Sequence, residues 1–217
     1  EVLDSGRKLV LVSSGAVGAG MGQLGLKKRP TDLAMLQAVA AIGQTYLVQT
    51  YDREFRRFGR HAAQILLVAD DLDHRTRYLN IRNTILNLLE LGAVPIINEN
   101  DTVSVEELRT TFGDNDRLAA MMTNLIRAPL MVLLSDVQGL FNGDPSLPES
   151  KLVNTVPKID EGVYGMVRDK LTGLSKGGMA SKIEAARIAT TAGENVIITS
   201  GKVPGALRKI IDGEIVG

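Results

Sequence analysis

The sequence contains no cysteine and no tryptophan, and only two of its 217 residues are histidines. Without cysteine the chain has no disulfide, no thiolate nucleophile and no cysteine-ligated zinc. Two histidines also argue against a catalytic triad built on histidine and against a site of several histidine ligands. We therefore expect no protein-built metal site.

The chain also lacks an excess of charge of either sign. It carries 25 basic and 25 acidic side chains, and only 4% of its residues are aromatic. This composition gives no electrostatic or stacking case for binding nucleic acid or a membrane surface. No apolar run reaches the length of a membrane span and no signal peptide is visible, so we expect a cytoplasmic globular protein.

Short apolar segments alternate with segments of helical periodicity along the whole chain. The pattern predicts strands at 9–12, 64–68, 94–97, 130–134 and 196–198, and helices at 31–58, 76–92, 116–126 and 179–192. Alternating strands and helices are typical of a mostly parallel sheet between two helical layers. The only candidate boundary is an irregular excursion over 139–173, which separates an earlier half from a later one.

Two clusters of carboxylates and amides flank one loop. Residues 98–101 (Asn-Glu-Asn-Asp) follow a buried-type strand, and residues 113–116 (Gly-Asp-Asn-Asp) open the next predicted helix. At the carboxyl ends of strands such groups face the crevice where ligands bind, and they suit an amino acid with its ammonium and carboxylates. The alternative is a polar turn followed by an aspartate N-cap.

Two glycine-rich stretches follow strands or precede helices. Residues 13–22 lack the dinucleotide-binding spacing, because the third glycine would fall at Gln23, so they form either an anion-binding loop or a tight strand-to-helix turn. Residues 171–182 lack the P-loop spacing, but they bring lysines and a hydroxyl to a helix N-terminus that favours anions. Lys182 either leans back over that loop or is a solvated surface lysine.

These motifs, together with 134–136 (Leu-Ser-Asp), resemble in their order the glutamate-phosphorylating branch of the amino acid kinase family. The resemblance runs over essentially the whole chain. It implies a three-layer αβα sandwich with an open, mainly parallel sheet of about eight strands. It further implies one domain over 1–217, with an amino-acid-binding half at 1–138 and a nucleotide-binding half at 139–217.

The resemblance implies ATP-dependent phosphorylation of the glutamate side-chain carboxylate, the first step toward proline, with Mg²⁺ held through the phosphates. It assigns Lys182 to the transferred phosphoryl group and Asp116 to orienting the catalytic lysines. Matched by position, the glutamate-binding residues are Ser14, Gly15, Asp101 and Asn115. The nucleotide-binding residues are Ser135, Asp136, Lys176, Gly177, Gly178, Met179, Ala180, Ser181 and Lys182.

The physical chemistry agrees with these roles. A carboxylate that attacks ATP brings two anions together, so positive charge must offset their repulsion. Asp101 can accept from the substrate ammonium while Asn115 donates to its α-carboxylate. Ser135 and Asp136 either contact a ribose or base or cap the turn that follows them.

Several alternatives stay open from the sequence alone. An aspartate or N-acetylglutamate kinase, or a non-catalytic module that binds an amino acid or nucleotide, fits the same pattern. The chain begins at Glu1, and residues 1–6 look like the last turn of a helix closing at Gly6, so we expect the family's first strand and lysine-containing phosphate loop upstream. Relatives commonly form homo-oligomers and respond to proline; the helix at 31–58 serves either a subunit contact or the core.

Overall fold

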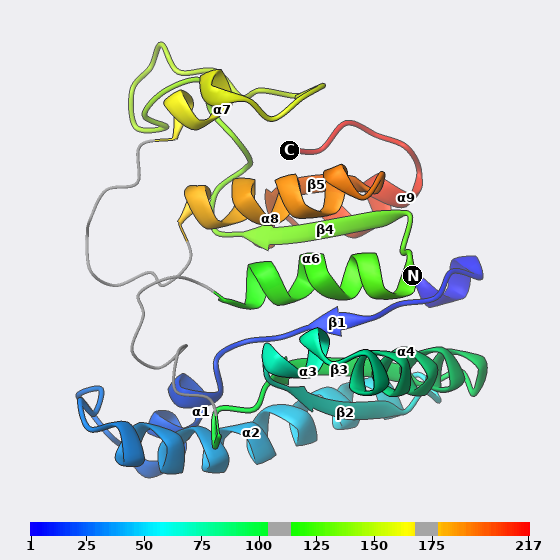
Figure 1. Ribbon diagram of the computed structural model, residues 1–217. Coiled ribbons are helices and arrows are strands. Elements are labelled where there is room, and N and C mark those ends of the chain that lie inside the picture. The colour runs from blue at the N-terminus through cyan, green and yellow to red at the C-terminus, as the bar shows by residue number, and fades with distance from the viewer. Residues whose placement is uncertain (104–113, 168–177) are drawn as a thin grey trace. The chain divides into compact units, whose positions relative to one another are not determined.

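The computed structural model describes residues 1–103, 114–167 and 178–217 (Figure 1). The helical elements are η1 (Leu3–Ser5), α1 (Ala16–Leu24), α2 (Leu33–Arg56), α3 (Asp70–Asp73), α4 (Arg75–Glu90), α6 (Asp114–Ile126), α7 (Glu161–Met166), α8 (Met179–Thr191) and α9 (Ala206–Ile211). The strands are β1 (Leu11–Val12), β2 (Ala62–Leu67), β3 (Val94–Glu99), β4 (Leu130–Ser135) and β5 (Asn195–Ser200). Within these ranges, no helix combines the length and the apolar character that crossing a bilayer requires.

The chain divides into two compact units. The amino-terminal unit comprises residues 7–111, and the carboxyl-terminal unit comprises residues 1–6 together with 112–217. The first six residues include η1, which ends at Gly6 with a left-handed φ of 79°, so the predicted helical turn closing at this glycine is confirmed.

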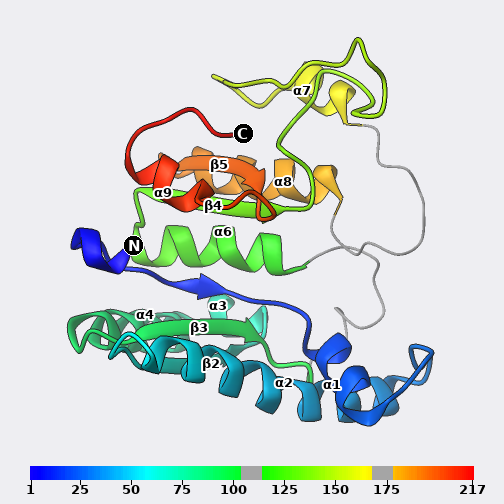
Figure 2. The same cartoon turned by 180° about the vertical axis from the view of Figure 1, so that it is seen from behind.

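The amino-terminal unit is built on a parallel sheet with strand order β1-β3-β2. Figures 1 and 2 show α2 and α4 on opposite sides of this sheet. The central strand β3 is fully buried at Val94, Ile96 and Ile97, which explains its almost unbroken apolar sequence. The predicted alternation of parallel strands and helices is therefore confirmed in this unit.

The glycine-rich stretch 13–22 contains a tight turn followed by most of α1. Gly15 adopts a left-handed φ of 95°, which turns the chain from β1 into α1, so the predicted strand-to-helix turn is present, and anion binding there stays a prediction. Farther along, α1 packs directly on the backbone of α2. A Cβ at Gly20 would lie 1.9 Å from the Val39 carbonyl oxygen, and a Cβ at Gly43 would lie 1.8 Å from the Ala16 carbonyl oxygen. The glycines therefore permit this close approach.

The carboxyl-terminal unit is built on the parallel pair β4 and β5, whose register runs from Leu130 opposite Asn195 to Ser135 opposite Ser200. The helices α6 and α8 pack against each other and against these strands through a core of Ala120, Met131, Leu133, Ala185 and Ala189. The excursion after β4 contains an antiparallel bridge between Phe141 and Leu152, and it then enters α7. The short helices α3, α7 and α9 were not predicted.

Candidate functional site

The predicted substrate residues Ser14, Gly15 and Asp101 lie at the carboxyl edge of the amino-terminal sheet. Parallel pairing sets Val12 beside Ile97, and the Ser13 backbone N–H donates to the Ile97 carbonyl oxygen at 2.8 Å. The ends of β1 and β3 are therefore adjacent, as the carboxyl ends of neighbouring parallel strands must be. The structure thus brings the Ser14–Gly15 turn and the segment leading to Asp101 to one edge.

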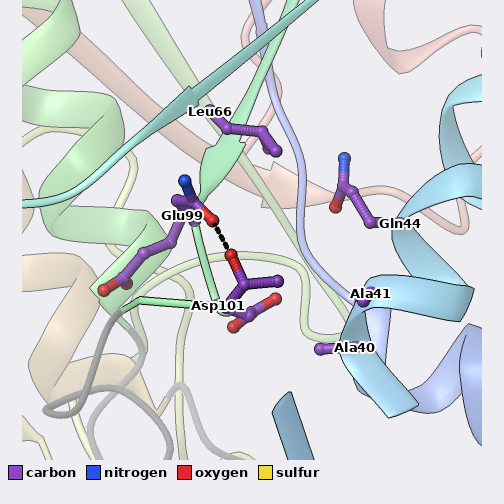
Figure 3. A pocket seen from close by; sticks show the side chains of 8 residues that line it. Ala40, Ala41, Gln44, Leu66, Glu99 and Asp101 are labelled. Atoms are coloured by element: carbon purple, nitrogen blue, oxygen red, sulfur yellow. Dashed lines mark hydrogen bonds between the residues drawn. The ribbon is translucent and has the colours of Figure 1, made fainter. Parts of the chain in front are cut away.

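Asp101 lines a small pocket at this edge (Figure 3). Ala40, Ala41 and Gln44 of α2 lie on one side, and Leu66, Glu99 and Asp101 lie on the other. The pocket is small, with a cavity volume of about 20 Å³, which is room for about one water molecule. In the part of the chain that the structure describes, no basic side chain is among its lining residues.

Two buried polar contacts support this edge, and neither was predicted. The Asn98 Nδ2 donates to Gln44 Oε1 at 2.7 Å, and the Ser13 and Tyr51 hydroxyls lie 3.0 Å apart. A signal for Gln44 is present in the sequence, because it occupies the buried face of α2 with Val39 and Ala40, where an apolar residue is expected.

The carboxyl-terminal unit brings together three of the predicted site residues. Lys182 Nζ lies 2.9 Å from Asp116 Oδ2, and the Ser181 hydroxyl donates to the same oxygen at 2.8 Å. Lys182 is only 8% exposed, so it is not a solvated surface lysine. Asp116 and Lys182 are thus in contact although they lie 66 positions apart, and the role of Asp116 in orienting a catalytic lysine stays a prediction.

The N-terminus of α8 supplies the rest of this region. Gly178 is the residue before the helix, Met179 and Ala180 open it, and the Ser181 hydroxyl also approaches the Gly178 carbonyl oxygen at 3.0 Å. The positive end of a helix of this length favours an anion such as a phosphate. Lys176 and Gly177 lie outside the described residues.

Ser135 and Asp136 end β4 in the same unit. The Ser135 hydroxyl accepts from the Val137 backbone N–H at 3.5 Å and approaches an Asp136 carboxylate oxygen at 3.3 Å. The turn-capping alternative is thus realised for Ser135, while the Asp136 side chain is exposed. Contact with a ribose or base stays a prediction.

The predicted glutamate-binding residues belong to two different units of the chain. Asn115 immediately precedes Asp116 on α6 in the carboxyl-terminal unit, whereas Ser14, Gly15 and Asp101 belong to the amino-terminal unit. Gly113, which opens the second polar cluster, lies outside the described residues. Joint binding of one ligand by Asn115 and Asp101 therefore stays a prediction.

An ion-paired cluster on α7 and α8 contains several titrating groups whose pKa values are shifted. The Tyr164 hydroxyl donates to Glu184 at 2.9 Å, and Arg187 donates two hydrogen bonds to the same carboxylate. Hydrogen bonding by Arg187 lowers the pKa of Glu184. Partial burial, followed by the Glu184 carboxylate, raises the pKa of Tyr164. These contacts connect α7 to α8.

The side chains of the two units that could bind a metal ion are histidine, aspartate and glutamate. Across residues 1–103, 114–167 and 178–217, no three histidine, aspartate or glutamate side chains gather closely enough to hold an ion. The Asp116 carboxylate, beside the first turn of α8, is engaged by Lys182 and Ser181. This donor set fits Mg²⁺ that arrives bound to nucleotide phosphates and waters, as Mg²⁺ commonly does.

Comparison with known proteins gives concordant results. The model of the amino acid kinase family matches residues 1–200. The chain is 51% identical over 218 residues to a glutamate 5-kinase of Methylococcus capsulatus, covering 100% of this chain and 58% of the relative. It is 47% identical over 216 residues to a glutamate 5-kinase of Rhodopirellula baltica, covering 100% and 56%. The chain thus spans a little over half the length of these relatives.

A solved structure extends the comparison to the fold. Carbamate kinase from Giardia lamblia bound to AMP-PNP superposes with a TM-score of 0.60 at 18% identity, covering 99% of this chain and 84% of that one. At this identity the likeness establishes a shared α/β fold and not a shared substrate.

Proposed function

The chain belongs to the amino acid kinase family, and from this premise we propose that it transfers the γ-phosphoryl group of ATP to the side-chain carboxylate of L-glutamate. The products are glutamyl 5-phosphate and ADP, in the first step of proline biosynthesis. The names of its relatives support glutamate as the acceptor. The observation that carries the proposal is the partly buried Lys182–Asp116 pair at the N-terminus of α8.

Phosphoryl transfer requires the protein mainly to position the two substrates and to supply positive charge. A new bond forms between a glutamate carboxylate oxygen and the γ-phosphorus, while the bond from that phosphorus to the β–γ bridging oxygen breaks. The acceptor is already deprotonated at neutral pH, so no general base is required. What the reaction needs is positive charge that offsets the repulsion of two anions.

Lys182 is placed to supply part of that charge. Its ammonium group is held by Asp116 and shielded from water, which strengthens its interaction with a phosphoryl group. The N-terminal turn of α8, with Gly178 through Ser181, adds the helix dipole. We propose that Lys176, Gly177, Ser135 and Asp136 complete the nucleotide site. Mg²⁺, when bound with ATP, neutralises phosphate charge.

The amino acid is proposed to bind at the carboxyl edge of the amino-terminal sheet. Asp101 accepts from its ammonium group, and the Ser14–Gly15 turn and Asn115 meet its carboxylates. The acidic pocket that Asp101 lines supports an ammonium-bearing ligand. In this proposal amino-acid binding belongs mainly to residues 1–138 and nucleotide binding to residues 139–217.

Finer features of the enzyme remain proposals of the same kind. The described strands form a three-stranded and a two-stranded parallel sheet. We infer that in the whole protein they belong to one open sheet of about eight strands between helical layers. We also propose that the protein is cytoplasmic, that it forms a homo-oligomer and that proline inhibits it.

Hydroxylamine trapping of the acyl phosphate tests the proposal. The full-length gene product is incubated with ATP, Mg²⁺, hydroxylamine and either glutamate, aspartate or N-acetylglutamate, with a reaction lacking ATP as control. We expect ATP-dependent hydroxamate from glutamate, with much lower rates for the other acceptors. A clear preference for aspartate or N-acetylglutamate would identify a sibling enzyme. Ligand binding without hydroxamate would instead indicate a non-catalytic binding module.

A further inference from the structure

One hydrogen-bonded pair behind the Ser14–Gly15 turn has no role in the proposal so far. The Tyr51 hydroxyl of α2 lies 3.0 Å from the Ser13 hydroxyl, at the end of β1. Ser13 is only 6% exposed, whereas Ser14 and Gly15, the next two residues, are exposed. The pair therefore lies on the protein side of a turn that is itself open to a ligand.

Ser13 is held by its main chain as well as by its side chain. Its backbone N–H donates to the Ile97 carbonyl oxygen at 2.8 Å, which fixes the end of β1 against the central strand β3. Its hydroxyl meets Tyr51 on α2. The Ser14–Gly15 turn therefore begins at a residue that is fixed to two elements of the amino-terminal unit.

The hydroxyl pair continues into the main chain of the turn. Ser13 Oγ lies 3.4 Å from the Ser14 carbonyl oxygen, which can only accept. A hydroxyl donates one hydrogen bond, so both contacts are made when Tyr51 donates to Ser13 and Ser13 donates to the Ser14 carbonyl. The Ser14 carbonyl and the Gly15 N–H share one planar trans peptide, so holding the carbonyl toward Ser13 directs this N–H the opposite way.

We propose that Tyr51 is a positioning residue for the amino acid: through the Ser13 hydroxyl it holds the Ser14–Gly15 peptide so that the Gly15 N–H faces a substrate carboxylate. A backbone N–H that already points at the carboxylate binds it more tightly, because no free energy is spent on ordering the donor. Without the Tyr51 hydroxyl, the buried Ser13 hydroxyl loses a partner and can turn to another rotamer, so the peptide is less constrained. This inference rests on the proposed function, since it takes the ligand to be an amino acid bound at the Ser14–Gly15 turn.

Tyr51→Phe is the informative substitution, because it removes only the hydroxyl group. Tyr46→Phe is the matched control, because it makes the same chemical change on the same helix at a residue that is 43% exposed. For each full-length variant, hydroxamate formation gives kcat and the KM values for glutamate and ATP. Urea unfolding without ligand gives the midpoint.

We expect Tyr51→Phe to raise the KM for glutamate about fivefold, which corresponds to the typical net strength of one hydrogen bond, with the KM for ATP within about twofold of wild type. Tyr46→Phe is expected to leave both values unchanged. A KM for glutamate that Tyr51→Phe leaves unchanged, even with a lowered urea midpoint, would show that the pair serves folding alone and would overturn the inference. A parallel rise in both KM values would also overturn it.

Ser13→Ala tests the route through which Tyr51 acts. It removes the middle hydroxyl, so the KM for glutamate should rise at least as much as in Tyr51→Phe, again without a change in the KM for ATP. In the double variant, Tyr51→Phe should add nothing to Ser13→Ala, because its partner is already missing. Effects that multiply in the double variant would show that the two residues act independently and would overturn the inference.

The same measurements separate the inference from the proposed function. A wild-type enzyme that does not use glutamate would refute the proposed function and the inference with it, whereas normal wild-type turnover with unaffected variants refutes the inference alone.

Discussion

The contact between Lys182 and Asp116 allows the most demanding test of the proposed chemistry. Lys182→Met removes the ammonium group and keeps an unbranched apolar stem of similar length. Asp116 then loses the donor at 2.9 Å but keeps the Ser181 hydroxyl at 2.8 Å. The variant therefore changes the charge at the N-terminus of α8 with little change in volume.

The structure sets the expected magnitudes. Removing one partner of a fully buried ion pair costs about 3–5 kcal/mol of folding free energy. Here the Asp116 side chain is 18% exposed and retains one hydrogen bond, so we expect a smaller loss of about 1–3 kcal/mol. Turnover should fall much further, by about a thousandfold, which corresponds to about 4 kcal/mol of transition-state stabilisation.

The two quantities are measured separately. Urea unfolding gives the free energy of unfolding, and hydroxamate formation gives kcat and the KM for ATP. The exposed Lys209→Met on α9 is the matched control and should change stability by less than about 0.5 kcal/mol. Asp116→Asn alone and combined with Lys182→Met completes a double-mutant cycle, in which the double variant should be less destabilised than the sum of the single variants.

Two results would refute this reasoning. A Lys182→Met enzyme that keeps kcat within about tenfold of wild type would show that its charge does not act in the transition state. Additive stability losses in the cycle would show that the observed contact carries no coupling energy.

Four further predictions concern other parts of the chain. Gly43→Ala should lower the free energy of unfolding by about 2 kcal/mol or more, whereas Gly18→Ala, whose Cβ would meet nothing within 4 Å, should be neutral or slightly stabilising in urea melts. Asp101→Ala should raise the KM for glutamate about tenfold or more and leave the KM for ATP unchanged. A KM for glutamate equal to that of the wild type would contradict the assignment of Asp101 to the substrate ammonium group. Because the pKa of Glu184 is lowered, its contribution to stability is present above its ordinary pKa of 4.5 and is lost as the pH falls through the lowered pKa. Glu184→Gln should therefore weaken the decline of Tm at acid pH. Because the pKa of Tyr164 is raised, its contribution to stability is present below pH 10.0 and is lost as the pH rises through the raised pKa. Tyr164→Phe should therefore weaken the decline of Tm at alkaline pH. A slope of Tm against pH that either variant leaves unchanged would contradict the prediction for that residue.

Helices and strands with a clear hydrophobic periodicity or a continuous apolar run were predictable from the sequence. The helix expected at 31–58 is α2, Leu33–Arg56, with Asp32 as its N-cap, and the strand expected at 94–97 is the central strand β3. The helix α1 was missed because it contains three glycines, which disfavour helices in isolation; of these, only Gly20 lies against the backbone of α2. The six-residue helices α7 and α9 are too short to show a period.

The site was predictable to a different degree in its two units. Lys182 and Asp116 were assigned through a family resemblance, and their contact joins positions 66 apart that no local pattern relates. Gln44 was missed although it interrupts an apolar helix face. Its partner Asn98 lies 54 positions away, so only the packing of α2 beside the end of β3 defines what it does.

The backbone contact between α1 and α2 has a consequence for the amino-acid pocket. Ala16, whose carbonyl oxygen meets Gly43, directly follows the Ser14–Gly15 turn, and Gly43 directly precedes Gln44. The α2 wall of the pocket is thus joined to the Ser14–Gly15 turn through main-chain atoms, which cannot change rotamer to absorb a disturbance. Any change that separates the two helices by a few tenths of an ångström should alter substrate affinity and stability together, so mutations in this part of the core will have difficulty improving one without harming the other.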